Sequence, residues 1–488
     1  MTAESRRHPF AAGYLFGGAC AAAIPTVAMV ADMPNARYPM AVVSVVVFFA
    51  ATATRTSMEH FGPLISPQTI AVSVWGLLLV VFPIALNYFP AVLGQLPALP
   101  PDRTVNLAML LNVVAFLSFM VGYHLRLARP SKPAPSDGAA LANLNPLIGS
   151  FAVAGVLGIV IRFGSVDAFT SYLQGTGLTY RFEQLAGLRA VLATILPPFL
   201  SFSFVMMLQR WRLKKQLTVP RVIVAGAGVV APLVLYSYNR AAVVIPLVGL
   251  VGVLGHLGGR RRTGMLAIFV VAMALGSYQA GSIRSQITAT EGGRFSLAEV
   301  GIDPTNGPSW WETLSMYGQS PQLTAFALTV PLRQDFPGQP LISSLLSPVP
   351  GLGKHFRDST GTAAYNLAIY GTPKIVDQIM PLTAESWGSL GPLGTVSLFC
   401  AIGALVGHAH QRFLTRQSLI KSYICMVLGT WFSLASIVSL LVLAQIFVYF
   451  LWPHLTFVLI ESVRKSWMTG AAPYVREDSN EKGMVRGG

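Results

Sequence analysis

Long apolar runs in the sequence set the strongest limit on what the chain can fold into. They recur along most of its 488 residues, and only 11% of the residues are charged, whereas soluble chains carry about 25%. A helix can cross a bilayer because it satisfies its backbone polar groups internally. The sequence therefore predicts an all-α fold, a polytopic membrane helical bundle.

Runs of roughly 20 residues predict about 12 spans. The last run, 422–463, is long enough for two spans joined by a tight turn. We expect four parts: nine spans in 1–281, an extracytoplasmic lid loop at 282–388, three spans in 389–470 and a disordered cytoplasmic tail at 471–488. The predicted spans lie near residues 11–31, 38–54, 67–89, 104–125, 146–163, 188–208, 220–238, 241–257, 264–281, 389–409, 422–441 and 444–463.

The distribution of Lys and Arg between the loops predicts the orientation. Cytoplasmic loops of membrane proteins carry an excess of these residues. With the N-terminus in the cytoplasm, most of the cations fall on the inner side of the predicted bundle. We therefore expect a multi-pass protein of the cytoplasmic (inner) membrane with both termini in the cytoplasm. The inner cations are Arg55, Arg126, Arg129, Lys132, Arg210, Arg212, Lys214, Lys215, Arg221, Arg260, Arg261, Arg262, Arg412, Arg416, Lys421, Arg464 and Lys465.

The lid loop at 282–388 is mixed in polarity but is not of low complexity. It contains aromatic residues such as Trp310, Phe336 and Tyr365. Long loops of this kind are usually functional or disordered. We expect a small, partly helical lid that rests on the outer face of the bundle.

Several kinds of site are missing from the sequence. It has no phosphate-binding G-x-x-x-x-G-K-[ST] loop, no zinc-ligand spacing and no DxD pair. The formal charge of +15 follows from the cytoplasmic excess of cations, so no nucleic acid is expected as a partner. We expect neither a metal nor a cofactor.

The acidic residues argue against an ion-coupled transporter. Such proteins usually place ionisable residues near the middle of the bilayer. Here the acidic residues fall in loops, loop edges or tails, apart from Glu461 at an inner helix end. An uncoupled flippase stays open as an alternative.

Cations at the outer face run against the orientation rule and form a candidate binding site. They are Arg162, Arg181, Arg189, Arg240, Arg284, Lys354 and Arg357. The alternative for each one is a side chain that extends to the membrane interface. That alternative is weakest for Arg240, which lies between two predicted spans with almost no loop. A cluster of Arg suits the pyrophosphate of a lipid-linked substrate, because the planar guanidinium binds phosphate through two N–H groups.

Two residues are candidates for a general base. His355 is the only histidine that this topology places in an outer loop, and Glu385 lies where the loop meets a span. A carboxylate partly withdrawn from water can accept a proton from a substrate hydroxyl. The alternative for both is an ordinary loop residue. We favour Glu385 slightly, because packing against a span fixes its geometry.

The order of these parts resembles the O-antigen polymerase family, the Wzy-type polysaccharide repeat-unit polymerases. Local similarity lies in SYNRAA at 237–242, in LSPVPG at 346–351 followed by Lys354, and in ESWGSLG at 385–391. The family often has Asn-Phe-Gly near the third stretch, where this chain has Trp387 and Gly388. The resemblance in architecture covers most of the chain. The three stretches occur in the same order as in the family and on the same side of the predicted membrane.

The resemblance implies a glycosyltransferase that is independent of metals. Its donor is a glycan on undecaprenyl pyrophosphate, and its acceptor is a lipid-linked repeat unit. The product would be O-antigen, capsule or exopolysaccharide, with a chain-length regulator and a flippase as partner proteins. The outer cations would bind the pyrophosphate, and Glu385 or His355 would activate the acceptor hydroxyl. An O-antigen-ligase-like transferase and a glycolipid flippase or transporter stay open as alternatives.

Overall fold

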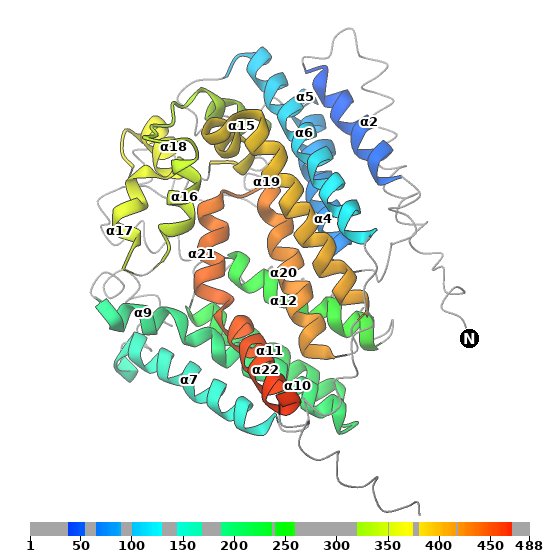
Figure 1. The fold of residues 1–488 in the computed structure, drawn as a ribbon, viewed down its shortest axis with the longest axis vertical. Helices are drawn as coiled ribbons and strands as arrows, with labels where there is room; N and C mark the ends of the chain where they lie inside the picture. The colour runs from blue at the N-terminus through cyan, green and yellow to red at the C-terminus, as the bar shows by residue number, and fades with distance from the viewer. Residues whose placement is uncertain are drawn as a thin grey trace, which may run out of the picture.

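The computed structural model describes residues 38–53, 65–88, 100–128, 144–167, 187–236, 240–258, 320–349, 351–373, 380–415 and 418–470. These residues form helices, with no strand among them (Figure 1). The helices are α2 (Met40–Thr52), α4 (Pro67–Gly76), η3 (Leu77–Val81), α5 (Phe82–Tyr88), α6 (Asp102–Leu127), α7 (Asn145–Phe163), α9 (Gly187–Ile195), α10 (Pro197–Leu213), α11 (Val219–Tyr236), α12 (Arg240–Gly258), α15 (Ser320–Thr329), α16 (Gln339–Leu346), α17 (Gly353–Phe356), η5 (Arg357–Ser359), α18 (Gly361–Tyr370), α19 (Leu382–Thr415), α20 (Leu419–Ser433), η6 (Leu434–Ser436), α21 (Leu440–Phe450) and α22 (Trp452–Gly470).

The structure confirms the all-α fold with apolar helices able to cross a membrane, but it does not confirm the predicted number of about 12 spans. Within the described residues, 6 helices are long and apolar enough to cross a membrane, or up to 7 if a bent pair counts as one span. Three other predicted spans correspond to shorter apolar helices, Met40–Thr52, Val219–Val230 and Val244–His256. The predicted spans at 11–31 and 264–281 and the tail at 471–488 lie outside the described residues.

The helix from Pro67 to Asn87 widens in its middle. Residues Leu77–Val81 form a π-helical segment between α4 and α5. Pro83 follows directly, and a proline ring within an α-helix meets the carbonyl of the residue four positions before it. The wider turn gives the ring room without ending the span.

Helix α19 differs from the predicted boundary between loop and span. It begins at Leu382 rather than near 389, so Glu385 lies within the helix. Gly391 interrupts it with φ 67° and ψ −159°, a conformation that only glycine adopts readily, and Pro392 follows. The Ser386 and Thr395 hydroxyls lie 3.0 Å apart across this break. A short first half therefore precedes the long membrane helix.

Helices α6 and α19 pack closely through glycine. A Cβ atom at Gly122 would collide with the backbone of Cys400, and one at Gly403 would collide with the backbone of Phe119. Small residues allow membrane helices to approach at this distance. Gly249 of α12 is packed in a similar way against α20, where an added Cβ would lie 2.6 Å from Val427.

The predicted pair of spans at 422–441 and 444–463 corresponds to one helix long and apolar enough to cross a membrane, Leu419–Ser436, and to a bent pair of helices. The turn between them falls at 437–439, between η6 and α21. Helices α21 and α22 of the bent pair meet at an angle of 57°. Pro453 lies in the first turn of α22, where its missing N–H breaks the hydrogen-bond ladder from α21.

The described part of the predicted loop, residues 320–373, forms short helices and is called the lid below. Helix α15 packs against the beginnings of α2 and α6, with Ala325 in a cluster that contains Tyr38, Ala41 and Val105. Figure 1 shows α15 to α18 gathered at one end of the long helices. Tyr365 of α18, Ala327 of α15 and Ala384 of α19 share a second small core. The lid is therefore packed onto one end of the bundle.

Candidate functional site

Glu385 is buried where the lid meets the bundle. Its side chain has no exposed surface. The Ser344 hydroxyl of α16 donates a hydrogen bond to Oε1 at 2.5 Å. The backbone N–H of Leu440, at the start of α21, donates one to Oε2 at 3.2 Å. The carboxylate therefore joins three helices that are far apart in the sequence.

Helix geometry explains why a carboxylate is held here. The first N–H groups of a helix have no partner within that helix, and the helix dipole favours negative charge beside them. Glu385 accepts from the first residue of α21, while Ser439 caps the same helix by accepting from the Val442 N–H. The backbone of Gly361, at the start of α18, also hydrogen-bonds to the carboxylate. Two helix N-termini thus meet at one side chain.

Gly361 is fitted closely to this carboxylate. A Cβ atom at Gly361 would lie 2.9 Å from both Cγ and Oε1 of Glu385, closer than real contacts of this kind. Thr360 caps α18 by accepting from the Ala363 N–H at 3.1 Å. The start of α18 is thereby fixed against α19, and the lid is held by two of its helices, α16 and α18.

The predicted cationic residues of the lid lie on a short segment next to α16. Lys354 and His355 are in α17, Arg357 begins η5, and all three side chains are exposed. Both short helices pack against α16. The side chain of His355 is therefore open to a substrate, whereas the oxygens of Glu385 are already occupied by protein donors.

The structure also brings together two of the predicted arginines. Arg162 is half-buried in the last turn of α7, and Arg189 is exposed near the start of α9. A Cβ atom at Gly164, which ends α7, would lie 3.2 Å from Nη2 of Arg189. Helix α9 contacts α21, and α21 contacts α16. These arginines are thus connected to the lid through a single intervening helix.

The remaining predicted cations are not placed by the structure. Arg240 is the first residue of α12, as expected for the start of a span, but its side chain is outside the described part. Arg181 and Arg284 also lie outside the described residues. Among the described residues, no group of three or more His, Cys, Asp or Glu side chains could hold a metal ion.

The partners of two acidic residues cannot be predicted from the sequence. Nothing in the sequence identifies Ser344 or the Leu440 N–H as donors to Glu385, since neither is an unusual residue. Lys421 and Glu461 form an ion pair at 2.5 Å between α20 and α22, with side chains 8% and 13% exposed. Both were predicted at the inner ends of spans, but their pairing depends on the packing of α22 against the bundle.

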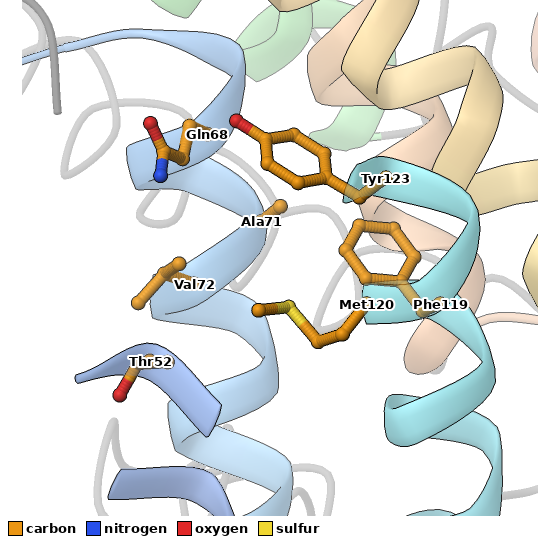
Figure 2. A pocket seen from close by; sticks show the side chains of 7 residues that line it. All are labelled: Thr52, Gln68, Ala71, Val72, Phe119, Met120 and Tyr123. Carbon is orange, nitrogen blue, oxygen red and sulfur yellow. The ribbon is translucent and has the colours of Figure 1, made fainter. Parts of the chain in front are cut away.

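A separate small pocket lies between α2, α4 and α6 (Figure 2). It is lined by Thr52, Gln68, Ala71, Val72, Phe119, Met120 and Tyr123. The buried hydroxyl of Tyr123 has no hydrogen-bond partner among the described residues. None of the predicted site residues lines this pocket. Its walls are mainly apolar, so it offers no group suited to the chemistry considered for the lid.

Comparisons with protein-family models, with curated proteins and with solved structures find no match to this chain.

Proposed function

We propose that the protein is a lipid-linked glycosyltransferase that polymerises oligosaccharide repeat units carried on undecaprenyl pyrophosphate. The observation that carries this proposal is the lid, which Glu385 fixes over the ends of apolar helices and which presents Lys354, His355 and Arg357. A lipid-linked substrate needs its apolar chain in the membrane and its charged headgroup at the surface. The junction between lid and bundle offers cations beside such a boundary.

The cations take the role of binding the leaving group. In glycosyl transfer, an acceptor hydroxyl attacks the anomeric carbon of the donor glycan, and the bond from that carbon to the pyrophosphate oxygen breaks. Negative charge then accumulates on the undecaprenyl pyrophosphate. Arg162 and Arg189 on one side, and Lys354 and Arg357 on the other, are suited to stabilise it. Arg240, Arg181 and Arg284 belong to the same proposal from the sequence.

His355 is the better candidate for the base. The acceptor hydroxyl must lose its proton as it attacks, and a base has to reach that hydroxyl within hydrogen-bond distance. His355 is exposed, whereas Glu385 is completely buried and accepts hydrogen bonds through both oxygens. We therefore assign the proton transfer to His355 and assign to Glu385 the fixation of the lid. The sequence alone slightly favours Glu385 as the base, so this assignment reverses that preference.

A transporter is the second candidate, because the structure contains broken helices. Transporters often build their sites from discontinuous spans. Here α19 is interrupted at Gly391, and α21 and α22 are bent by 57°. Glu461, on the second of these broken spans, forms an ion pair with Lys421 of the neighbouring helix α20. A glycolipid flippase would use such features, whereas a transferase would use the lid.

Deleting the gene in its source cell and analysing the surface glycan separates these functions. A polymerase predicts that the deletion strain carries single repeat units and that the intact gene restores a ladder of long chains. Full-length polymer that is not joined to its final acceptor would instead indicate the ligase-like transferase. Repeat units trapped on the inner leaflet would overturn both transferase assignments and indicate the flippase. His355→Gln should reproduce the deletion, while Asp358→Asn, three positions away on the same exposed segment, should not.

A further inference from the structure

Helix α16 of the lid buries its two serines and exposes two large apolar side chains. Ser343 and Ser344 are buried, with 1% and 0% of their surface exposed, and Leu341 is buried beside them. Ile342 and Leu345 are 44% and 48% exposed. Ile342 and Leu345 are three positions apart and so share one face of the helix. The outward face of α16 is therefore apolar, although the helix buries polar side chains on the face toward the protein.

Such an arrangement is typical of contact with lipid. A surface helix in water buries its apolar stripe and exposes its polar face. In a bilayer, polar side chains face the interior of the bundle instead. The apolar helix α7, long enough to cross a membrane, also exposes large apolar side chains, with Val153 68% exposed. The outer face of α16 therefore resembles the lipid-facing surface of a span rather than the surface of a water-soluble lid.

The position of α16 agrees with membrane contact. Ser344 is hydrogen-bonded to Glu385, which is hydrogen-bonded to the first residue of α21. Helix α16 thus lies at the depth where α19 and α21 begin, and both belong to apolar stretches able to cross a membrane. Figure 1 shows α16 among the lid helices, next to α21. An exposed apolar face at this depth is placed where lipid can contact it.

Cationic residues follow the apolar face of α16 along the chain, as expected for a segment that lies in a membrane interface. Leu352 is exposed, and Lys354 and Arg357 come directly after it in α17 and η5. At an interface, apolar side chains enter the acyl region while Lys and Arg reach the phosphate groups. Anionic headgroups attract such cations.

We propose that residues 339–349 and 351–357 lie in the membrane interface, with Ile342, Leu345 and Leu352 in contact with phospholipid acyl chains and with Lys354 and Arg357 at the phosphate level. The lid is then a lipid-embedded edge of the bundle rather than a cap in water. This inference does not depend on the proposed transfer reaction. It refines the prediction of a lid resting on the outer face of the bundle.

Spin labels in the full-length protein in phospholipid nanodiscs test the proposal. The three native cysteines are first replaced. Single cysteines at Ile342 and Leu345 then carry the label, since both positions are exposed and the substitutions leave buried contacts intact. Val153→Cys serves as the control for lipid contact, and Lys214→Cys, on an exposed side chain in a predicted cytoplasmic loop, serves as the control for water. Relaxation by oxygen, which concentrates in lipid, is compared with relaxation by a water-soluble nickel chelate.

The proposal expects the ratio of oxygen to nickel accessibility at Ile342 and Leu345 to approach the ratio at Val153 and to exceed the ratio at Lys214. A ratio at Ile342 and Leu345 equal to that at Lys214 would place α16 in water and overturn the proposal. Protection of both labels from both reagents would also overturn it, because protein rather than lipid would then cover the face. Elution of each variant as a single species in size exclusion confirms that the fold is intact before the ratios are compared.

Discussion

The Ser344 hydroxyl donates a hydrogen bond to Oε1 of Glu385 at 2.5 Å, and the two residues are 41 positions apart in the chain. This bond connects the lid helix α16 to the first turn of the long helix α19. Both side chains are fully buried. Loss of either partner would leave a buried polar group unsatisfied, so the pair fixes the lid to the bundle.

Ser344→Ala should loosen the lid. The substitution leaves Oε1 of Glu385 without its donor, which costs about 1–3 kcal/mol for a buried group. Ser343→Ala is the matched control, because the neighbouring hydroxyl is equally buried but has no hydrogen-bond partner among the described residues. Thermal unfolding in detergent should show a lower midpoint for Ser344→Ala and an unchanged or higher one for Ser343→Ala. Equal midpoints for the two variants would mean that Glu385 does not hold the lid in place.

Glu385→Gln should be tolerated, and Glu385→Ala should not. In the glutamine variant the amide oxygen can accept from the Leu440 N–H, while the amide nitrogen donates to the Ser344 hydroxyl, which is able to accept. Alanine removes the acceptor of the Ser344 hydroxyl, of the Leu440 N–H and of the Gly361 backbone, and it opens a cavity beside Gly361. Glycan ladders from cells with matched protein levels should stay long with Gln and collapse with Ala. A stable Glu385→Gln protein that yields only single repeat units would identify Glu385 as the base after all.

Arg240→Lys should lower the activity without lowering the amount of protein. Lysine keeps the charge but loses the planar pair of N–H groups that binds a phosphate through two hydrogen bonds. Arg240 is the first residue of α12, so the substitution falls at a helix end where it does not interrupt the helix. Ladder length in cells is the measurement, with Arg221→Lys as the control, a half-buried arginine in the first turn of α11 on the predicted cytoplasmic side. Normal ladders with Arg240→Ala would mean that Arg240 only extends to the interface.

Cysteine labelling should place the lid outside the cytoplasm. Positive residues concentrate on the opposite side of the predicted bundle. In a variant without native cysteines, a membrane-impermeant maleimide should label Asp358→Cys in intact cells and Lys214→Cys only after permeabilisation. Both side chains are exposed, so accessibility depends on the side of the membrane alone. The reverse pattern would move the proposed site to the cytoplasm and exclude a substrate on the outer face.

The sequence predicts the helices of this protein better than their breaks. Apolar runs identify the spans at Asp102–Leu127 and Asn145–Phe163 within a few residues, because hydropathy alone decides which segments enter a membrane. The break at Gly391 and the bend before Trp452 are less visible. Proline and glycine also occur in membrane helices that stay continuous, since neighbouring helices satisfy the freed backbone groups.

The candidate site is predictable only in part, because some of its contacts depend on helices that are distant in the sequence. Histidine and lysine in an outer loop can be found from the sequence, and the exposure of His355 and Lys354 agrees with that expectation. The environment of Glu385 cannot be found in this way. Its burial depends on α16 and α21, which are distant in the sequence and contribute a common serine and a backbone N–H.

Reconstitution of the purified protein tests the central claim most directly. The protein is placed in liposomes with a single undecaprenyl-pyrophosphate-linked repeat unit and no nucleotide sugar, and the lipid products are separated by mass. The account predicts glycans of two and more units together with one free undecaprenyl pyrophosphate for each bond formed. His355→Gln should abolish both products, and Glu385→Gln should retain them. Movement of the lipid-linked unit across the bilayer without any joined glycan would contradict the account and identify a flippase.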